Sequence, residues 1–229
     1  MARRPQTSPR KTASQKRSRL TVDALVEATA RVLIKEGYDR MSTNKIAARA
    51  GVSIGSLYQY FPSKEALVAA VIERHTHALS QVVRKALVKV ATQPIETAVR
   101  ELVAAAIDAH RIDPRLHRVL AEEVPRTGRL ENIEAVERYA GGLFRDYLEA
   151  RRSEIVVADL DLAAFVLVTT IEALTHSAVL NRPDVLADEK AGKFVDDVTR
   201  LVLGYLRTPS PLRQGTRPSR RLGAGSSSG

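Results

Sequence analysis

Residues 43–61 carry the sequence TNKIAARAGVSIGSLYQYF, which decides the fold of the N-terminal part of the chain. Gly51 divides this stretch into two segments, and glycine supplies the left-handed backbone that a sharp turn after a helix requires. Ala47 in the first segment is small enough to let a second helix cross closely. Leu57 and Phe61 lie four residues apart in the second segment and therefore share one helical face. The pattern predicts two short helices joined by a tight turn, which is a helix-turn-helix.

The second predicted helix leaves small and polar residues outside when Leu57 and Phe61 point inward. Gly55 has no side chain, so the backbone at this position can approach DNA closely. The Gln59 amide suits hydrogen bonds to adenine in the major groove, and the Tyr58 hydroxyl can reach a phosphate oxygen. An ordinary helical hairpin with exposed tyrosines is the alternative interpretation. The small residue, the glycine turn, the apolar anchors and the exposed aromatics together favour a helix that contacts DNA bases.

The rest of the chain is also helical in pattern. No sustained alternation of apolar and polar residues predicts a strand, and capping residues and prolines separate the helical segments. We therefore expect an all-α fold, with a three-helix DNA-binding domain followed by a helical regulatory and dimerisation domain, about nine helices in all. Helices are predicted over 21–37, 42–51, 53–62 and 63–92, from 94 onward, from 113 to a break at 125–128, and over 130–153, 159–181 and 188–206.

The charge of the chain is concentrated at its two ends. The net charge is +10; residues 1–19 hold seven basic side chains and residues 207–229 hold five, with no acidic residue in either segment. Basic arms attract polyanions, so the N-terminal arm is expected to lie along DNA phosphates or to enter a minor groove. The C-terminal tail is rich in Ser, Gly, Pro and Arg and is expected to be a solubilising, disordered segment.

Composition and motifs exclude several protein classes. The chain has no cysteine, which rules out disulfide scaffolds, cysteine-ligated zinc and thiol catalysis. No apolar signal segment opens the chain, and its most apolar stretch, 160–180, is interrupted by two acidic residues and a histidine. No phosphate-binding loop, dinucleotide fingerprint or hydrolase elbow indicates an enzyme. His75 and His77 diverge by about 200° on a helix and cannot share a metal, so we expect no metal site and no cofactor.

Three motifs point to a known family. Gly37-Tyr38, IAARAGVS at 46–53 and GSLYQYFPSKEAL at 55–67 resemble the DNA-binding domain of the tetracycline-repressor (TetR) family, over about residues 20–75. The resemblance implies a homodimeric, all-helical bacterial transcription factor that acts in the cytoplasm and associates with the nucleoid when bound to DNA. Such a protein is usually a repressor that a small-molecule ligand releases from a palindromic operator.

The candidate DNA contacts follow from the outward face of the second helix and from the motif positions of the resemblance. Lys64 begins the next helix, where a cation opposes the helix dipole and is better placed if a phosphate lies nearby. The candidates are Ser42, Thr43, Asn44, Ser53, Ile54, Gly55, Ser56, Tyr58, Gln59, Tyr60 and Lys64.

The predicted organisation is a disordered basic arm over 1–19, a DNA-binding domain over 20–64 that extends to about 75, a ligand-binding and dimerisation domain over 65–206, and a basic tail over 207–229. The last two helices are apolar enough to pack with their symmetry mates in a four-helix bundle. Polar and aromatic residues are candidates for the lining of a ligand cavity, namely His110, His117, Tyr139, Phe144, Tyr147, Glu172 and His176.

Some alternatives stay open at the level of sequence. Glu172 and His176 are four residues apart and form either a core or interface pair or a ligand anchor. The same DNA-binding domain could belong to an activator or to a regulator that needs no ligand. A module that binds a membrane surface or a protein partner is a more distant alternative, supported by the basic tails alone.

Overall fold

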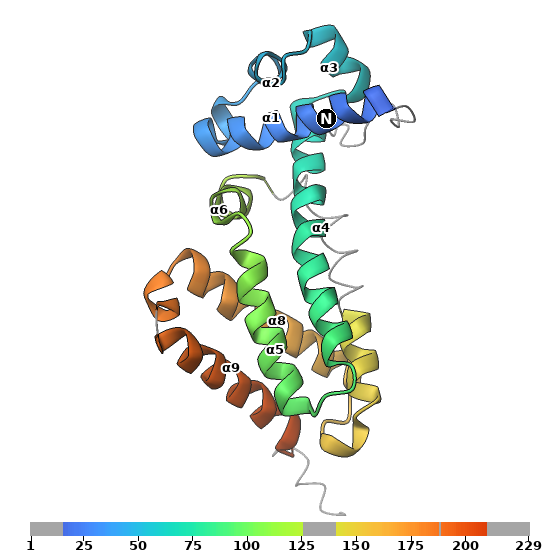
Figure 1. The fold of residues 1–229 in the computed structure, drawn as a ribbon, viewed down its shortest axis with the longest axis vertical. Coiled ribbons are helices and arrows are strands. Elements are labelled where there is room, and N and C mark those ends of the chain that lie inside the picture. The colour runs from blue at the N-terminus through green and yellow to red at the C-terminus, as the bar shows by residue number, and fades with distance from the viewer. Residues whose placement is uncertain (1–15, 126–140, 188, 210–229) are drawn as a thin grey trace, which may run out of the picture.

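The computed structural model describes residues 16–125, 141–187 and 189–209, and within these ranges the chain is helical with no strand (Figure 1). The all-α class is therefore confirmed. Most of the basic arm and most of the basic tail lie outside the described residues, as do the predictions made for them. The described part is elongated, with the first three helices at one end and a helical bundle at the other (Figure 1).

The N-terminal unit consists of α1 (Lys16–Arg40), α2 (Thr43–Ala50) and α3 (Ile54–Tyr60). α1 begins ahead of the cap predicted at Thr21, because the basic residues and leucine that precede this position are themselves good helix formers. Gly37, with φ of 77°, breaks the last turn of α1 at the position where the sequence predicted its end.

Local capping fixes the ends of α2 and α3. The Ser42 side chain accepts a hydrogen bond from the Lys45 N–H at 3.4 Å, and the Ser53 Oγ accepts one from the Ser56 N–H at 3.1 Å. Gly51 ends α2 in the left-handed conformation, with φ of 68° and ψ of 29°. The helix-turn-helix predicted from residues 43–61 is thus confirmed together with its caps.

The remaining helices form the bundle. Ser63 caps α4 as predicted, and Asp113 and Asp159 cap α6 and α8. Residues 141–149 are helical, whereas the first half of the helix predicted over 130–153 falls mostly outside the described residues. The elements are α4 (Lys64–Val90), α5 (Ile95–His110), α6 (Pro114–Glu122), α8 (Leu160–Leu180) and α9 (Glu189–Arg207), with short 3-10 turns at Arg152–Glu154 and Pro183–Leu186.

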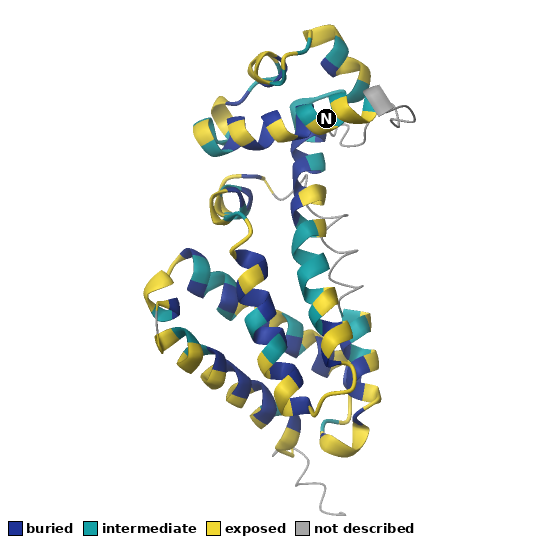
Figure 2. Ribbon diagram, viewed as in Figure 1, coloured by how far each residue is buried: buried dark blue, intermediate teal, exposed yellow. Residues whose placement is uncertain are grey.

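Two hydrophobic cores lie at the two ends of the molecule, and α4 contributes to both (Figure 2). The larger core joins the end of α4 to α5, α8 and α9. The smaller one joins α1, α2, α3 and the start of α4, and it also takes in Leu116, Leu120 and Val124 from α6 and the residues after it. α6 therefore packs with the N-terminal unit, although its place in the sequence assigned it to the predicted regulatory domain.

A buried arginine closes the far end of the larger core. Arg151 donates hydrogen bonds to the carbonyl oxygens of Ala91 at 2.6 Å and Gln93 at 3.0 Å, in the connection between α4 and α5. Its guanidinium also lies 4.2 Å from the centre of the Tyr147 ring. These contacts satisfy a buried charge and hold the helix over 141–149 against the end of α4.

α8 is long and apolar enough, by length and composition alone, to cross a membrane. Its inner residues, such as Ala163 and Leu167, belong to the larger core, so one face of the helix is committed to protein packing. Leu162 and Phe165 on another face are 53% and 64% exposed. α8 thus has an apolar face that the described residues leave partly exposed.

Candidate nucleic-acid interface and ligand cavity

α3 presents a mixed surface because Leu57, and Phe61 at the C-terminal end of the helix, are buried in the core while Ile54 and the polar residues face outward. Leu57 and Phe61 are 0% and 1% exposed, as their four-residue spacing predicted. Gln59 and Gly55 are exposed, and Tyr58 is 41% exposed on the same outer side. The candidates Asn44, Ser53 and Ile54 are exposed as well.

A hydrogen bond links the two helices of the motif. The hydroxyl oxygens of Thr43 on α2 and Tyr58 on α3 lie 3.1 Å apart, so each side chain orients the other. The Ser53 and Ser56 hydroxyls are 2.9 Å apart at the start of α3, where Ser53 also caps the helix. These contacts hold the polar candidates at the start and on the outer side of α3 in fixed positions.

Two of the half-buried candidates contact residues outside the helix-turn-helix or the hydrophobic core. The Lys64 ammonium donates to the Tyr38 carbonyl at 3.2 Å and lies 4.1 Å from the centre of the Tyr38 ring. Tyr60 is half-buried and packs against the smaller core. Arg49, an exposed cation on α2, was not among the predicted contacts, although its position beside the turn could have indicated it.

Packing among the described residues does not require glycine at position 55. A Cβ at this position would meet, among the described residues, only the Ser53 Oγ at 3.9 Å, which is an ordinary contact distance. Glycine costs about 1 kcal/mol relative to alanine inside a helix. Packing among the described residues therefore gives no reason for glycine at this position.

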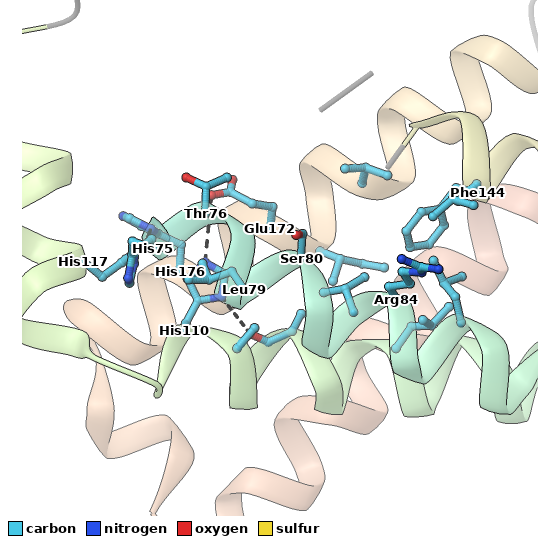
Figure 3. Close-up of a pocket in the computed structure, with 18 of the residues that line it drawn as sticks. His75, Thr76, Leu79, Ser80, Arg84, His110, His117, Phe144, Glu172 and His176 are labelled. Atoms are coloured by element: carbon cyan, nitrogen blue, oxygen red, sulfur yellow. Dashed lines mark hydrogen bonds and ion pairs between the residues drawn. The ribbon is translucent and has the colours of Figure 1, made fainter. Parts of the chain in front are cut away.

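A cavity of about 360 Å³ lies between α4, α5, α6 and α8. One end is mostly apolar and includes Leu87, Leu102 and Phe144, with the exposed Arg84 beside Phe144 (Figure 3). The other end gathers histidines, with Glu172 beside them (Figure 3). The lining is mostly apolar and carries a few polar groups, most of them at the histidine end, which is the usual composition of a small-molecule site.

The histidines at the polar end contact one another. His117 Nδ1 lies 2.9 Å from His75 Nε2, and His117 Nε2 lies 2.8 Å from His176 Nδ1. His110 Nδ1 lies 2.7 Å from the Ala106 carbonyl oxygen, so this nitrogen carries the proton and donates. Burial lowers the pKa of His75 and of His110 below its ordinary value, which favours their neutral forms.

Five of the seven predicted ligand residues line the cavity. Tyr147 does not belong to the lining formed by the described residues, because its ring packs against Arg151. Tyr139 lies outside the described residues. The five predicted residues that line the cavity are His110, His117, Phe144, Glu172 and His176.

Sequence reasoning missed the contribution of α4 to this site. His75 lies on the cavity side of α4 with Ile72, Leu79 and Val83, at the three- and four-residue spacing of one helical face. The Glu172 carboxylate lies 4.0 Å from His110 Nε2, a contact with α5 that spacing along α8 did not suggest.

The expectation of no metal site considered only His75 and His77. In the structure, histidines of separate helices, His110, His117 and His176, form a group that could hold a metal ion.

Comparison with known proteins decides the family. Residues 25–71 match the sequence profile of the bacterial regulatory proteins of the tetR family, and residues 94–206 match that of a tetracyclin repressor-like C-terminal domain. The two matches together cover well over half of the chain. This chain belongs to the TetR family.

Relatives of this TetR-family chain include other regulators. It is 36% identical over 91 residues to the uncharacterized HTH-type transcriptional regulator Rv1255c of Mycobacterium tuberculosis, a match that covers 40% of this chain and 43% of that protein. It is 29% identical over 143 residues to the HTH-type transcriptional repressor NicS of Pseudomonas putida, covering 61% and 66%. The chain thus spans less than half the length of the first of these curated relatives.

Solved TetR-family structures share the fold. The transcriptional regulator FadR from Bacillus subtilis, in complex with stearoyl-CoA, superposes with a TM-score of 0.60 at 18% identity, over 81% of this chain and 99% of that one. At this identity the likeness concerns architecture alone. It agrees with the arrangement of α1 to α3 at one end and the bundle at the other.

Proposed function

We propose that this TetR-family chain is a homodimeric transcriptional repressor that binds a palindromic operator through α3 and is released by a small molecule in the cavity. The observation that carries the DNA-binding part is the outer side of α3. There Gln59, Tyr58 and Gly55 are exposed, while Leu57 and Phe61 anchor the helix in the core. A short rigid helix with such a face fits a major groove.

Dimerisation is supported by the uncovered apolar surface of α8 and α9. Leu162, Phe165 and Leu201 are each more than half exposed, and exposed apolar residues of this size favour a partner surface. A second copy would cover them in a symmetric interface and would present a second α3 to a second half-site. The apolar composition of α8 is then explained by a protein partner, not by a membrane.

The ligand is inferred from the composition of the cavity. A mostly apolar lining with one polar end suits a molecule with an apolar body and a polar head. The stearoyl-CoA bound to Bacillus subtilis FadR is a molecule of this kind. We assign the cavity a role in binding and no role in catalysis. The protein would act in the cytoplasm of a bacterium.

α6 supplies a route from the cavity to DNA. Leu116 and Leu120 of α6 are buried in the smaller core with α1 and α4, while His117 and Leu120 also line the cavity. The Tyr38 N–H, at the end of α1, donates to the Glu123 carboxylate at 3.2 Å just after α6. A ligand that displaces α6 therefore moves α1. To release the operator, the ligand must bind the form with displaced α6 more tightly than the DNA-binding form, by several kcal/mol.

Selection of bound duplexes from a random pool by the purified full chain tests the proposal, with sedimentation of the complex in parallel. We expect one palindromic sequence bound by one dimer or an even number of chains. Enrichment of no sequence, or a monomer in solution and on DNA, would contradict it. Repression, favoured because NicS is a repressor, is then tested by a reporter gene downstream of the selected site.

A further inference from the structure

Four of the five histidines of the chain meet at the polar end of the cavity (Figure 3). His75 comes from α4, His110 from α5, His117 from α6 and His176 from α8. The fifth, His77, is exposed on α4. Polar rings are costly to bury unless their nitrogens find partners, so the convergence of four of them from four helices needs a chemical reason.

The spacing of the ring nitrogens matches a small coordination site. One nitrogen each from His110, His117 and His176 lies within 4.8 Å of the other two. The closest pair, His117 Nε2 and His176 Nδ1, is 2.8 Å apart. Tetrahedral ligands at the usual Zn–N distance lie about 3.3 Å from one another. Modest rotations of the three side chains would therefore place an ion between them.

The outer nitrogens of two of these rings are already held in the manner of metal ligands. His110 donates from Nδ1 to the Ala106 carbonyl, which leaves the Nε2 lone pair for an ion. His117 has Nδ1 2.9 Å from His75 Nε2, so with Nε2 on an ion its Nδ1–H donates to His75. A second hydrogen bond of this kind fixes the tautomer and the ring orientation of metal-ligating histidines.

We propose that His110, His117 and His176 bind one divalent transition-metal ion, with Zn²⁺ as the best candidate, and that His75 is a positioning residue for His117. Three imidazoles suit zinc, nickel or cobalt, whereas the hard cations Ca²⁺ and Mg²⁺ need an oxygen-rich site. Glu172, with its carboxylate 4.0 Å from His110 Nε2 and its side chain 59% exposed, stands beside the fourth position.

The ion would connect α5, α6 and α8 directly, and α4 through His75. Because α6 packs on the smaller core, which holds α1, α2 and α3, binding of the ion would change the affinity for the operator. The fourth coordination position of the ion could take the polar head of a ligand. This consequence rests on the proposed function. Metal binding itself does not, so the experiment measures the ion and not the DNA.

The experiment uses the full chain freed of metal with a chelator, titrated with Co²⁺ and then displaced with Zn²⁺. We expect one ion per chain and the visible d–d bands of a low-coordinate Co²⁺ site. His117→Ala and His176→Ala should each weaken Co²⁺ binding by more than about 100-fold, and His75→Ala by about tenfold to 100-fold. His75→Gln, whose amide can still hydrogen-bond to His117, should recover most of the affinity. The control His77→Ala removes a neighbouring histidine outside the cluster and should leave the affinity unchanged.

Far-UV circular dichroism verifies the fold of each variant. His176→Gln, which changes a half-buried and not a fully buried residue, replaces any alanine variant that does not fold. Zn²⁺ should also raise the melting temperature of the wild-type chain and not that of His176→Gln. Absence of d–d bands in the wild type would overturn the proposal, because the histidines would then form only a hydrogen-bonded chain. Equal Co²⁺ affinity in wild type and His117→Ala, or a loss in His77→Ala as large as in His176→Ala, would overturn it too.

Discussion

The helix-turn-helix and the cavity are built in opposite ways. The candidate DNA contacts fall almost entirely within residues 43–61, and their positions depend on neighbours a few residues away, such as the caps Ser42 and Ser53 and the turn at Gly51. The polar end of the cavity joins His75 to His176 through four helices. The first site is therefore rigid by local geometry, while the second changes whenever its helices shift.

This difference suits a regulator. A surface that must match one DNA sequence benefits from fixed geometry, whereas a sensor must respond to its ligand by moving. α6 belongs to both regions, because Leu116 packs in the DNA-binding core and His117 lines the cavity. We infer that a change in the cavity shifts α6, and that α6 then moves α1, α2 and α3 as a unit without changing their internal geometry.

The largest expected effect comes from the anchor of α3. Leu57→Ala should lower the free energy of unfolding by about 2–5 kcal/mol, because Leu57 is fully buried and the truncation leaves a void. The matched change Leu102→Ala should cost less, since Leu102 already borders the cavity. Denaturant unfolding followed by circular dichroism measures both. If Leu102→Ala lowered the free energy of unfolding more than Leu57→Ala, the contrast between a close-packed DNA-binding unit and a regulatory domain with a cavity would be wrong.

Gly55→Ala separates DNA binding from stability. Alanine has room among the described residues and is the better helix former, so we expect unchanged stability or a gain of up to about 1 kcal/mol. Operator affinity should nevertheless fall by at least about tenfold, because the added methyl group faces the DNA. Thermal unfolding and fluorescence anisotropy on the selected operator provide the two readouts. Unchanged affinity would show that DNA does not approach α3 at this residue.

Gln59→Ala should relax the preference at one base pair, at a cost of about 1–3 kcal/mol on the cognate site and little on a site mutated at that pair. Tyr58→Phe should instead weaken binding similarly at all sequences if the hydroxyl contacts phosphate. Gel-shift titrations on the selected site and its single-base variants distinguish the two patterns. If both variants bind as the wild type does, the contacts assigned to α3 are wrong.

The smallest effect concerns an ion pair that joins α1 to α4. Hydrogen bonding to Arg31, and then the charge of Arg74, hold the pKa of Glu27 below its ordinary value. A lowered carboxyl pKa stabilises the fold above the titration range of an unfolded glutamate, and the contribution is lost as the pH falls through the folded pKa. Since the groups are largely exposed, Glu27→Gln should cost about 0.5 kcal/mol at neutral pH. Thermal unfolding should show this difference vanish in acid; a difference that grew would contradict the assignment.

The same contrast explains what could be predicted from the sequence. Capping residues and four-residue spacing act locally, so α2, α3 and the buried Leu57 were correctly predicted. The grouping of His75 with His117, and the packing of α6 on α1, depend on how helices far apart in sequence meet. Tyr147 was placed in the cavity on its residue type alone, and its contact with Arg151 sets it elsewhere.

A footprint of the full chain on its selected operator tests the central claim most directly. We expect two symmetric protected half-sites whose centres lie about one turn of DNA apart, 10–10.5 base pairs or a geometric variant of it, on one side of the duplex. Gln59→Ala should change the sequence tolerance of both half-sites equally. Uniform protection along any duplex, or a single protected half-site bound by one chain, would contradict the account.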